Sequence, residues 1–280
     1  MMALHVDGLC KRYPGFALDH VGFGVAQGQI MGFIGRNGAG KTTTIKSLFN
    51  YVHPDEGHIT FFGLPFAENE AKIKQQVGYV GSDAGYYLQK RLRTLTDVTR
   101  SFYPGWDESV YRQCLSRFAL DETKRLRELS EGMKVKYQLT LALSHHARLL
   151  VLDEPTSGLD PASRDDLMEL FLDLAEREGV AILFSTHITG DLEKCADAVT
   201  YIQNGTILFS GSIDALRGQY VLVRGAEAQL APERRRGLIG YRAHRGEFNA
   251  MAERHHAPDY ADFSVTPATL EDVMVYLERM

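Results

Sequence analysis

The clearest chemistry in the chain belongs to a glycine-rich stretch, which reads Gly35-Arg36-Asn37-Gly38-Ala39-Gly40-Lys41-Thr42. It has the spacing of a P-loop, in which a glycine and four further residues are followed by Gly-Lys-Ser or Gly-Lys-Thr. Glycines allow successive backbone N–H groups to turn toward a phosphate with no Cβ in the way. Lys41 can reach the β- and γ-phosphates of a nucleotide, and Thr42 can ligate Mg²⁺. The stretch therefore predicts a site for a nucleoside triphosphate and magnesium.

The segments on either side are those that a phosphate-binding loop needs. Residues 29–34 are mostly apolar and predict a buried strand, whereas residues 43–49 can form a helix. The positive end of that helix would point at the same phosphates. A chance match in a glycine-rich loop is the alternative, but it does not explain the order of strand, loop and helix.

Two acidic residues and a histidine follow two further strand candidates. Asp153 and Glu154 come directly after the apolar run 149–152, and His187 follows the run 180–185. Ligands bind at the carboxyl ends of strands in parallel α/β sheets. At that edge Asp153 can hold Mg²⁺, Glu154 can orient or deprotonate a water molecule, and His187 can contact a γ-phosphate. A surface histidine at a strand end is the alternative for His187.

Two weaker candidates have a structural alternative each. Ser130-Glu131-Gly132 opens a predicted helix, so its N–H groups and hydroxyl can bind a phosphate, or Ser130 can simply cap the helix. Tyr13 precedes the Pro14-Gly15 turn and can stack on a purine base, or it can pack against the protein.

The remaining pattern predicts an α/β domain with a helical insertion and an appended region. Strands are expected at residues 4–9 and 16–26, and the block 94–146 has helical spacing with no strand signal. Strands return at 149–152 and 180–184. After residue 218, a strand at 220–223 is followed by the polar, poorly periodic segment 225–258 and a closing amphipathic helix.

Composition excludes several classes of protein. The 280 residues are 44% hydrophobic and 24% charged, which describes an ordinary globular chain. The net charge of 31 − 36 = −5 gives no electrostatic case for binding nucleic acid. The three cysteines lack a metal-ligand or redox spacing, which favours a reducing compartment. No secretory signal is expected, and no apolar run approaches the roughly 18 residues of a membrane-spanning helix.

Taken together, these motifs resemble the ATP-binding subunit of ABC transporters over residues 3–217. Residues 35–42 match its Walker A motif, 129–133 its signature, 149–154 its Walker B motif and 157–160 its D-loop. The resemblance implies a P-loop NTPase core with an antiparallel β subdomain and a helical subdomain at about 85–146. It places an ATP-binding domain at 1–218 and a small C-terminal α+β accessory region at 219–280.

The resemblance also implies an activity and a set of partners. Such subunits hydrolyse ATP with Mg²⁺, pair head to tail with a second ATP-binding subunit, and drive transmembrane permease subunits from the cytoplasmic face of the membrane. Each ATP lies between the P-loop of one subunit and the signature helix of the other. The implied catalytic residues are Glu154, His187 and Lys41, and the metal ligands Thr42 and Asp153. The implied nucleotide contacts are Tyr13, Gly35, Arg36, Asn37, Gly38, Ala39, Gly40, Lys41, Thr42, Thr43, Ser130, Gly132 and Asp160.

The chain departs from the family pattern at two places. The signature has Glu131 and Met133 where Gly and Gln are usual, but Ser130 and Gly132 remain. The family glutamine that contacts Mg²⁺ after the strand at 77–80 is replaced by Gly81-Ser82-Asp83, with Ser82 at the aligned position. We expect Asp83 to supply an oxygen ligand in its place.

The missing glutamine and the closing helix resemble ATPases of bacterial ABC-2-type exporters, several of which handle peptides or toxins. Peptide export is therefore favoured over export of drugs, lipids or polysaccharides. Non-transport ABC ATPases are disfavoured because the chain has one motif set and no long coiled coil. The signature and His187 argue against a P-loop kinase or GTPase, and intact Lys41 and Glu154 argue against a binding module without catalysis.

Overall fold

The computed structural model describes residues 1–81 and 87–278 of the 280-residue chain. They form two compact units, Met1–Leu208 and Phe209–Met280. The functional division expected after residue 218 stays a prediction. Ser82 and Asp83 lie outside the described residues. Among the helices that are described, none is long and apolar enough to cross a membrane.

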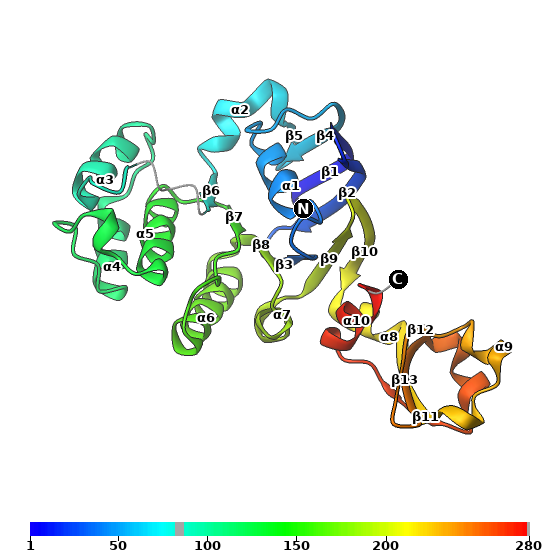
Figure 1. Ribbon diagram of the computed structural model, residues 1–280. Helices are drawn as coiled ribbons and strands as arrows, with labels where there is room; N and C mark the ends of the chain where they lie inside the picture. Colours follow the sequence, from blue (N-terminus) through cyan, green and yellow to red (C-terminus); the bar gives the residue numbers. More distant parts are fainter. Residues whose placement is uncertain (82–86, 279–280) are drawn as a thin grey trace. The chain divides into compact units, whose positions relative to one another are not determined.

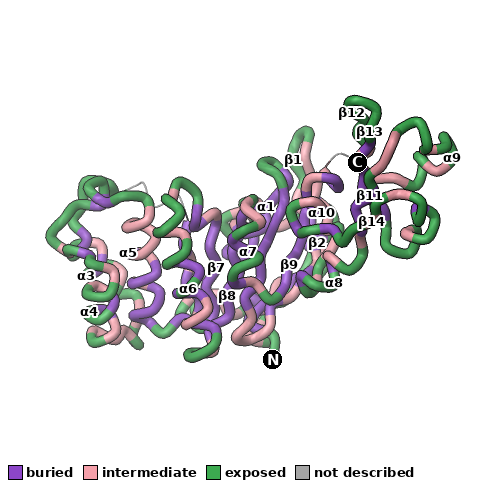
Figure 2. Tube along the Cα trace, turned by 90° about the horizontal axis from the view of Figure 1, so that it is seen from below, coloured by how far each residue is buried: buried purple, intermediate pink, exposed green. Residues whose placement is uncertain are grey.

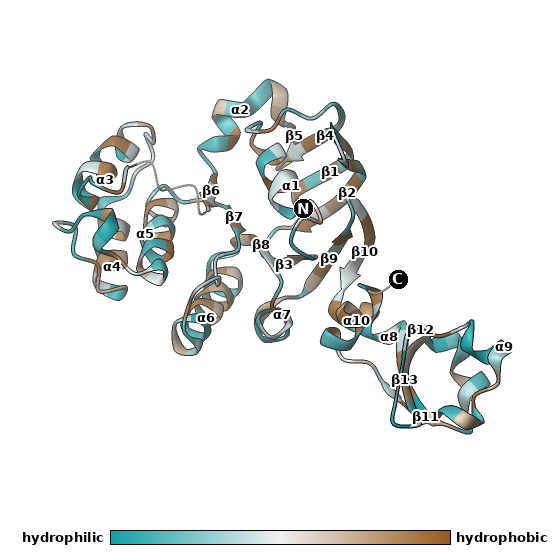
Figure 3. Cartoon of the chain, viewed as in Figure 1, coloured by the Kyte–Doolittle hydropathy of each residue, from teal (hydrophilic) through white to brown (hydrophobic). Residues whose placement is uncertain are grey.

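A six-stranded sheet forms the centre of the first unit. Its order is β10-β9-β3-β8-β7-β6, and the strands from β9 to β6 run parallel. Every residue of β3, β7 and β8 is buried, as expected for parallel strands covered on both faces (Figure 2). Most residues of these strands are hydrophobic (Figure 3). The strands span Ile30–Ile34 (β3), Val77–Val80 (β6), Leu149–Asp153 (β7), Ala181–Thr186 (β8), Ala198–Gln203 (β9) and Thr206–Ser212 (β10).

The β9–β10 turn holds the phosphate loop close to the second sheet. Asn204 and Gly205 both have positive φ, as a two-residue hairpin turn requires. The Gly205 N–H donates to the Ala39 carbonyl at 2.9 Å, and the Gly205 carbonyl accepts from the Asp19 N–H at 2.9 Å. A Cβ at Gly205 would lie 1.7 Å from the Ala17 carbonyl oxygen, so only glycine fits there.

The second sheet of this unit is antiparallel and has the order β2-β1-β4-β5. The strands span Met2–Tyr13 (β1), Phe16–Ala26 (β2), Glu56–Phe61 (β4) and Leu64–Pro65 (β5). β1 is longer at both ends than the expected 4–9 because it pairs with β2 from Met2 to Tyr13. The inner faces of both sheets share one apolar core with α1 (Lys41–Leu48).

Helices cover both faces of the central sheet, and the helical insertion lies beside its β6 edge (Figure 1). α6 (Pro161–Glu178) and α7 (Thr189–Cys195) lie on one face and α1 on the other. α2 (Phe66–Lys74) leads into β6. The expected helical insertion is confirmed: it contains α3 (Leu92–Ser101), α4 (Glu108–Arg117), the 3₁₀ turn η2 (Leu126–Glu128) and α5 (Glu131–Ser144).

The insertion has its own core, but α5 also packs closely on β6. Leu92, Leu126, Leu129 and Tyr137 are buried together within the insertion. A Cβ at Gly78 of β6 would lie 2.5 Å from the Ala142 Cβ of α5, so the helix approaches the strand as closely as glycine allows. The orientation of α5 is therefore tied to the sheet.

The second unit is a small α+β domain with the sheet order β12-β13-β11-β14. Its elements are α8 (Ile213–Gly218), β11 (Tyr220–Ala226), η3 (Glu227–Gln229), α9 (Pro232–Arg235), β12 (Ile239–His244), β13 (Glu247–Glu253), η4 (Arg254–Tyr260), β14 (Ser264–Pro267) and α10 (Leu270–Leu277). The β12–β13 hairpin lies within the segment 225–258, where the sequence had shown little periodicity. The hairpin forms because β13 pairs with β11 over its full length and buries Phe248 and Ala250.

Candidate functional site

The phosphate loop lies between β3 and α1, as predicted. Gly38 and Gly40 have φ of 84° and 114°, a region that favours glycine. A Cβ at Gly40 would also lie 2.7 Å from Leu18 Cδ2. The first turn of α1 has no acidic residue, so the positive end of the helix is available to an anion.

Lys41 is only 5% exposed and is held by the loop itself. Its Nζ donates to the Gly35 carbonyl at 2.8 Å and to the Arg36 carbonyl at 3.3 Å. The same Nζ lies 3.2 Å from Glu154 Oε1. Phosphate oxygens on the loop would compete with Glu154 for this ammonium group.

Thr42 and Asp153 are brought together at the carboxyl edge of the sheet. The Thr42 hydroxyl donates to Asp153 Oδ1 at 3.3 Å. Two oxygens at this separation suit Mg²⁺, whose 2.0–2.1 Å bonds place neighbouring octahedral ligands about 3 Å apart. Hydroxyl and carboxylate oxygens are also the ligand types that Mg²⁺ prefers. The pair can therefore hold the metal that the sequence predicts.

Ser185 supports this pair and was not predicted. The β7–β8 register places Ser185 beside Asp153. The buried hydroxyl of Ser185 donates to Asp153 Oδ1 at 2.7 Å and accepts from the Glu154 N–H at 2.8 Å. One side chain therefore fixes both acidic residues.

Glu154 is held in an unusual backbone conformation, with φ of 53°. Such a conformation is costly for a residue with a side chain and persists where the surroundings enforce it. Here the Ser185 hydroxyl binds the Glu154 N–H, while His187 Nδ1 lies 2.8 Å from Glu154 Oε2. With Lys41 at the other carboxylate oxygen, Glu154 is anchored at three points. The structure thus joins the predicted catalytic residues Lys41, Glu154 and His187.

A cavity of about 620 Å³ opens beside these residues. Thr42, Asp153, Glu154 and His187 line one side of it. The other side is a face of α5 that the sequence analysis missed, although the helical spacing of its members would place them together. This face consists of Glu131, Lys134, Val135 and Gln138.

Gln138 connects that helix face to the sheet. Its Oε1 accepts a hydrogen bond from the Gly81 N–H at 2.9 Å, just after β6. The bond joins α5 to the strand next to the one that ends in Asp153. No local pattern in the sequence identifies this contact, because it depends on how α5 crosses β6.

The signature and the D-loop each place some residues on this cavity, Glu131 from the first and Ser157 and Gly158 from the second, while Ser130 and Asp160 cap helices. Ser130 Oγ accepts from the Met133 N–H at 3.2 Å, so Ser130 caps α5. Asp160 caps α6, and hydrogen bonds from the hydroxyl and N–H of Ser163 lower the pKa of its carboxyl group. Ser130, Gly132 and Asp160 are not among the described residues that line the cavity. Their nucleotide contacts stay predictions.

Tyr13 and Asp83 are the two remaining predicted contacts. Tyr13 ends β1 and is 41% exposed. Lys11 Nζ lies 5.7 Å from the centre of its ring. Its stacking on a base stays a prediction. The predicted metal ligand Asp83 lies outside the described residues.

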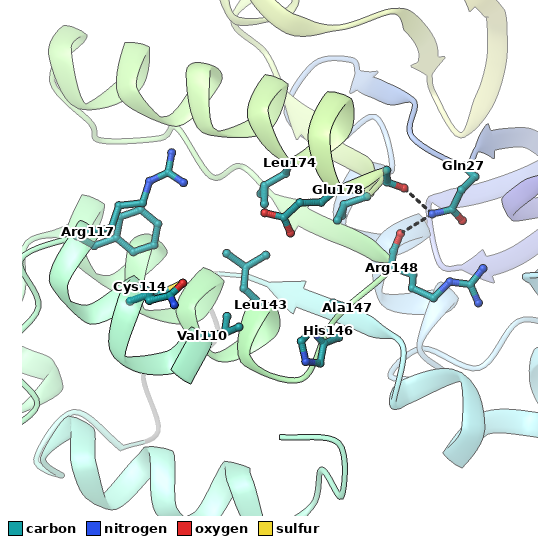
Figure 4. A pocket seen from close by; sticks show the side chains of 14 residues that line it. Gln27, Val110, Cys114, Arg117, Leu143, His146, Ala147, Arg148, Leu174 and Glu178 are labelled. Carbon is teal, nitrogen blue, oxygen red and sulfur yellow. Dashed lines mark hydrogen bonds between the residues drawn. The ribbon is translucent and has the colours of Figure 1, made fainter. Parts of the chain in front are cut away.

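Another cavity, of about 640 Å³, lies between the helical insertion and α6 (Figure 4). On its wall, Gln27 Nε2 donates to the Gly179 carbonyl at 2.6 Å. Burial raises the pKa of the Cys114 thiol on the same wall to about 11, so this thiol stays protonated at neutral pH. None of the predicted site residues is among its described lining residues. It is separate from the phosphate loop.

A phosphate loop facing a hydroxyl–carboxylate pair at the edge of a parallel sheet defines a P-loop nucleotide-binding protein. The family model described as ABC transporter matches residues 18–157, which is half of the chain. The chain belongs to this family: it is an ABC transporter ATP-binding subunit, and it hydrolyses ATP in support of transport. The family expected from the motifs, its fold and its enzymatic activity are confirmed.

Individual relatives agree with this assignment. The chain is 30% identical over 209 residues to the ABC transporter ATP-binding protein YtrB of Bacillus subtilis, covering 75% of this chain and 71% of that one. It is 35% identical over 203 residues to the bacitracin transport ATP-binding protein BcrA of Bacillus licheniformis, covering 72% and 66%. A solved ATP binding subunit of an ABC transporter superposes with a TM-score of 0.70 at 29% identity, covering 78% of this chain and 92% of that one.

Proposed function

We propose that this chain is the ATP-driven motor of a bacterial exporter that moves peptides. It acts as a pair of ATP-binding subunits on transmembrane permease partners, at the cytoplasmic face of the membrane. The observation that carries the hydrolytic part is the anchoring of Glu154 between Lys41 and His187, beside the Thr42–Asp153 pair. This arrangement supplies a base, a cation and a metal site within one cavity.

Each of these residues has a separate role in the hydrolysis of ATP. Thr42 and Asp153 hold Mg²⁺, which neutralises charge on the phosphates when it is bound. The glycine loop and Lys41 bind the phosphate oxygens. Glu154 polarises the attacking water, and His187 contacts the γ-phosphate while it orients Glu154 through their 2.8 Å contact. Ser185 keeps Asp153 and Glu154 in place through hydrogen bonds of 2.7 and 2.8 Å.

The position of Ser130 and Gly132 relative to the nucleotide cavity supports the pairing of two subunits. Ser130 and Gly132 do not line the cavity of their own chain among the described residues, so they are available to a nucleotide held by a second subunit. The ATP-binding cassette MJ0796, which shares the fold at a TM-score of 0.66 and 18% identity, has been solved as a dimer with ADP and Pi. We propose that Ser130 and Gly132 of this chain contact the nucleotide that the second subunit holds.

Peptide export is supported by the BcrA relatives, whose names give bacitracin transport for proteins 35% and 28% identical to this chain. Drug export is the second candidate, because the probable multidrug ATP-binding protein YbhF of Escherichia coli is 32% identical over 218 residues. That match covers only 37% of YbhF. Stimulation of ATP turnover by cyclic peptides, but not by hydrophobic drugs, in the complex purified with its permease would support peptide export. The reverse result would support the drug exporter.

Glu154→Gln tests the catalytic assignment. Loss of a general base costs about 10²- to 10⁴-fold, so we expect turnover to fall at least about 100-fold. ATP affinity is expected to stay near that of the wild type, and ATP with Mg²⁺ is expected to trap a dimer that light scattering detects after size-exclusion chromatography. Glu176→Gln, an exposed position on α6, is the matched control. Normal turnover in Glu154→Gln would reject the assignment.

A further inference from the structure

Cys10, His20 and Glu56 come together on the antiparallel sheet of the first unit. Cys10 lies on β1, His20 on β2, and Glu56 begins β4. One sulfur, one ring nitrogen and one carboxylate oxygen from these residues all lie within 4.8 Å of one another. None of the three is among the described residues that line the nucleotide cavity. The spacing of the cysteines along the chain gave no sign of this cluster, because its members come from three strands.

The backbone is irregular at this point of the sheet. The register of β1 shifts between Leu9 and Lys11 against β2, and between Asp7 and Cys10 against β4. His20 has φ of 48°, a conformation that is costly for a residue with a Cβ. Such local irregularities are concentrated at functional sites. They bring the three side chains together where a regular ladder would not.

Outer contacts support two of the three side chains as ligands. The His20 N–H donates to Cys10 Sγ at 3.3 Å, which stabilises negative charge on the sulfur. His20 Nδ1 lies 2.6 Å from Asp19 Oδ1. A carboxylate at one ring nitrogen is the usual support of a metal-binding histidine, because it orients the ring and leaves the other nitrogen as the ligand. With Asp19 at Nδ1, Nε2 is the His20 nitrogen that would coordinate a metal.

We propose that Cys10, His20 and Glu56 form a binding site for a divalent transition metal of the Zn²⁺ type. Sulfur, imidazole nitrogen and carboxylate oxygen are the three ligand types of protein zinc sites, whereas Mg²⁺ and Ca²⁺ prefer oxygen alone. Cys10 thiolate and Glu56 carboxylate together balance the charge of a divalent ion. On binding, the S–H bond of Cys10 breaks as the metal–sulfur bond forms, and the proton passes to solvent. Water completes the tetrahedron.

Charge around the cluster also bears on this site. Arg12 donates to Glu56 Oε1 at 2.9 Å, and both side chains are more than half exposed. An exposed ion pair of this kind contributes little to stability, so Glu56 can turn toward a metal at small cost. The site would then join β1, β2 and β4 at a point three residues before Tyr13.

Cobalt is the probe for this site, because thiolate-bound tetrahedral Co²⁺ shows a ligand-to-metal charge-transfer band and strong visible bands. The full-length protein, stripped of metal and kept reduced, is titrated with Co²⁺ and then with Zn²⁺. We expect one equivalent of Co²⁺ to produce the thiolate band and one equivalent of Zn²⁺ to remove it. Co²⁺ bound by Thr42 and Asp153 has no sulfur ligand and gives no such band, so the nucleotide site cannot mimic the result.

Variants separate the proposed ligands from the other thiols. Cys10→Ser is expected to abolish the thiolate band, while Cys114→Ser, at another buried cysteine, is expected to leave it unchanged. His20→Asn keeps a residue that tolerates positive φ, and we expect Co²⁺ to bind it at least about tenfold more weakly. Melting curves establish that each variant is folded. Absence of the band in the wild type, or its survival in folded Cys10→Ser, would overturn the proposal.

Discussion

Ser185→Ala isolates the contribution of a single hydroxyl group to the catalytic edge. Ser185 is 0% exposed, and its hydroxyl bonds both the Asp153 carboxylate and the Glu154 N–H. A hydrogen bond to a charged group contributes about 1.5–3 kcal/mol, and a buried N–H left without an acceptor costs about 1–3 kcal/mol. Because the two terms share one side chain and do not simply add, we expect the free energy of unfolding to fall by about 3 kcal/mol.

The same substitution should slow ATP turnover. Without Ser185, Asp153 loses a donor, and Glu154 loses one of the three contacts that hold its strained backbone and carboxylate. A loss of about 1.4 kcal/mol in transition-state stabilisation corresponds to a tenfold fall in kcat, and we expect a fall of at least about that size. Steady-state phosphate release measures kcat, and urea unfolding measures stability.

Ser144→Ala is the matched control for this experiment. Ser144 is also fully buried, but its hydroxyl donates to the Thr140 carbonyl within α5. We expect this control to turn over ATP at the wild-type rate. If Ser185→Ala loses stability but keeps the wild-type kcat, the bridging hydroxyl does not position the catalytic residues, and the reasoning is refuted.

Two more substitutions test the coupling of α5 and the effect of pH. Gln138→Ala removes the acceptor of the Gly81 N–H. We expect kcat/KM for ATP to fall about 2- to 13-fold, as for a bond worth about 0.5–1.5 kcal/mol. Gln113→Ala, which loses a weak 3.3 Å bond on α4, should not change it, and equal kinetics in both variants would count against the coupling. Burial lowers the pKa of His145, 7% exposed, to about 4. The folded-state pKa of His145 lies below the unfolded value of about 6.5. The resulting contribution of neutral His145 to the free energy of unfolding, at most about 3 kcal/mol, is therefore complete above pH 6.5 and is lost as the pH falls toward 4. In urea unfolding at a series of pH values, the free energy of unfolding of His145→Phe should fall less than that of the wild type over this range. Equal pH dependence in the two proteins would show that His145 is not its source.

Local sequence predicted the main elements of the catalytic edge because each carries its own signal. The apolar run ending at Asp153 indicated a strand buried on both faces, and β7 is such a strand. The glycines of the phosphate loop indicated a backbone whose N–H groups can turn toward a phosphate, and Gly38 and Gly40 have the positive φ that favours glycine. These features depend on residues that are close together in the chain, so periodicity and spacing reveal them.

Contacts between distant segments could not be predicted in this way. Ser185 bridges Asp153 and Glu154 only because β7 and β8 pair in one register, and a shift by one residue would turn it away. Gln138 reaches Gly81 only because α5 lies closely against β6. The β12–β13 hairpin was missed because much of β12 is exposed and its strand character depends on pairing with β13.

The turn at Asn204 and Gly205 connects the phosphate loop to the antiparallel sheet. Gly205 binds Ala39 of the phosphate loop with its N–H and Asp19 of β2 with its carbonyl, so one residue joins the phosphate loop to the antiparallel sheet. The paired strands β1 and β2 meet at the turn after Tyr13, the proposed contact of the base, and the loop is the proposed site of the phosphates. The β9–β10 turn therefore links the strand pair that carries the proposed base contact to the loop that carries the proposed phosphate contacts.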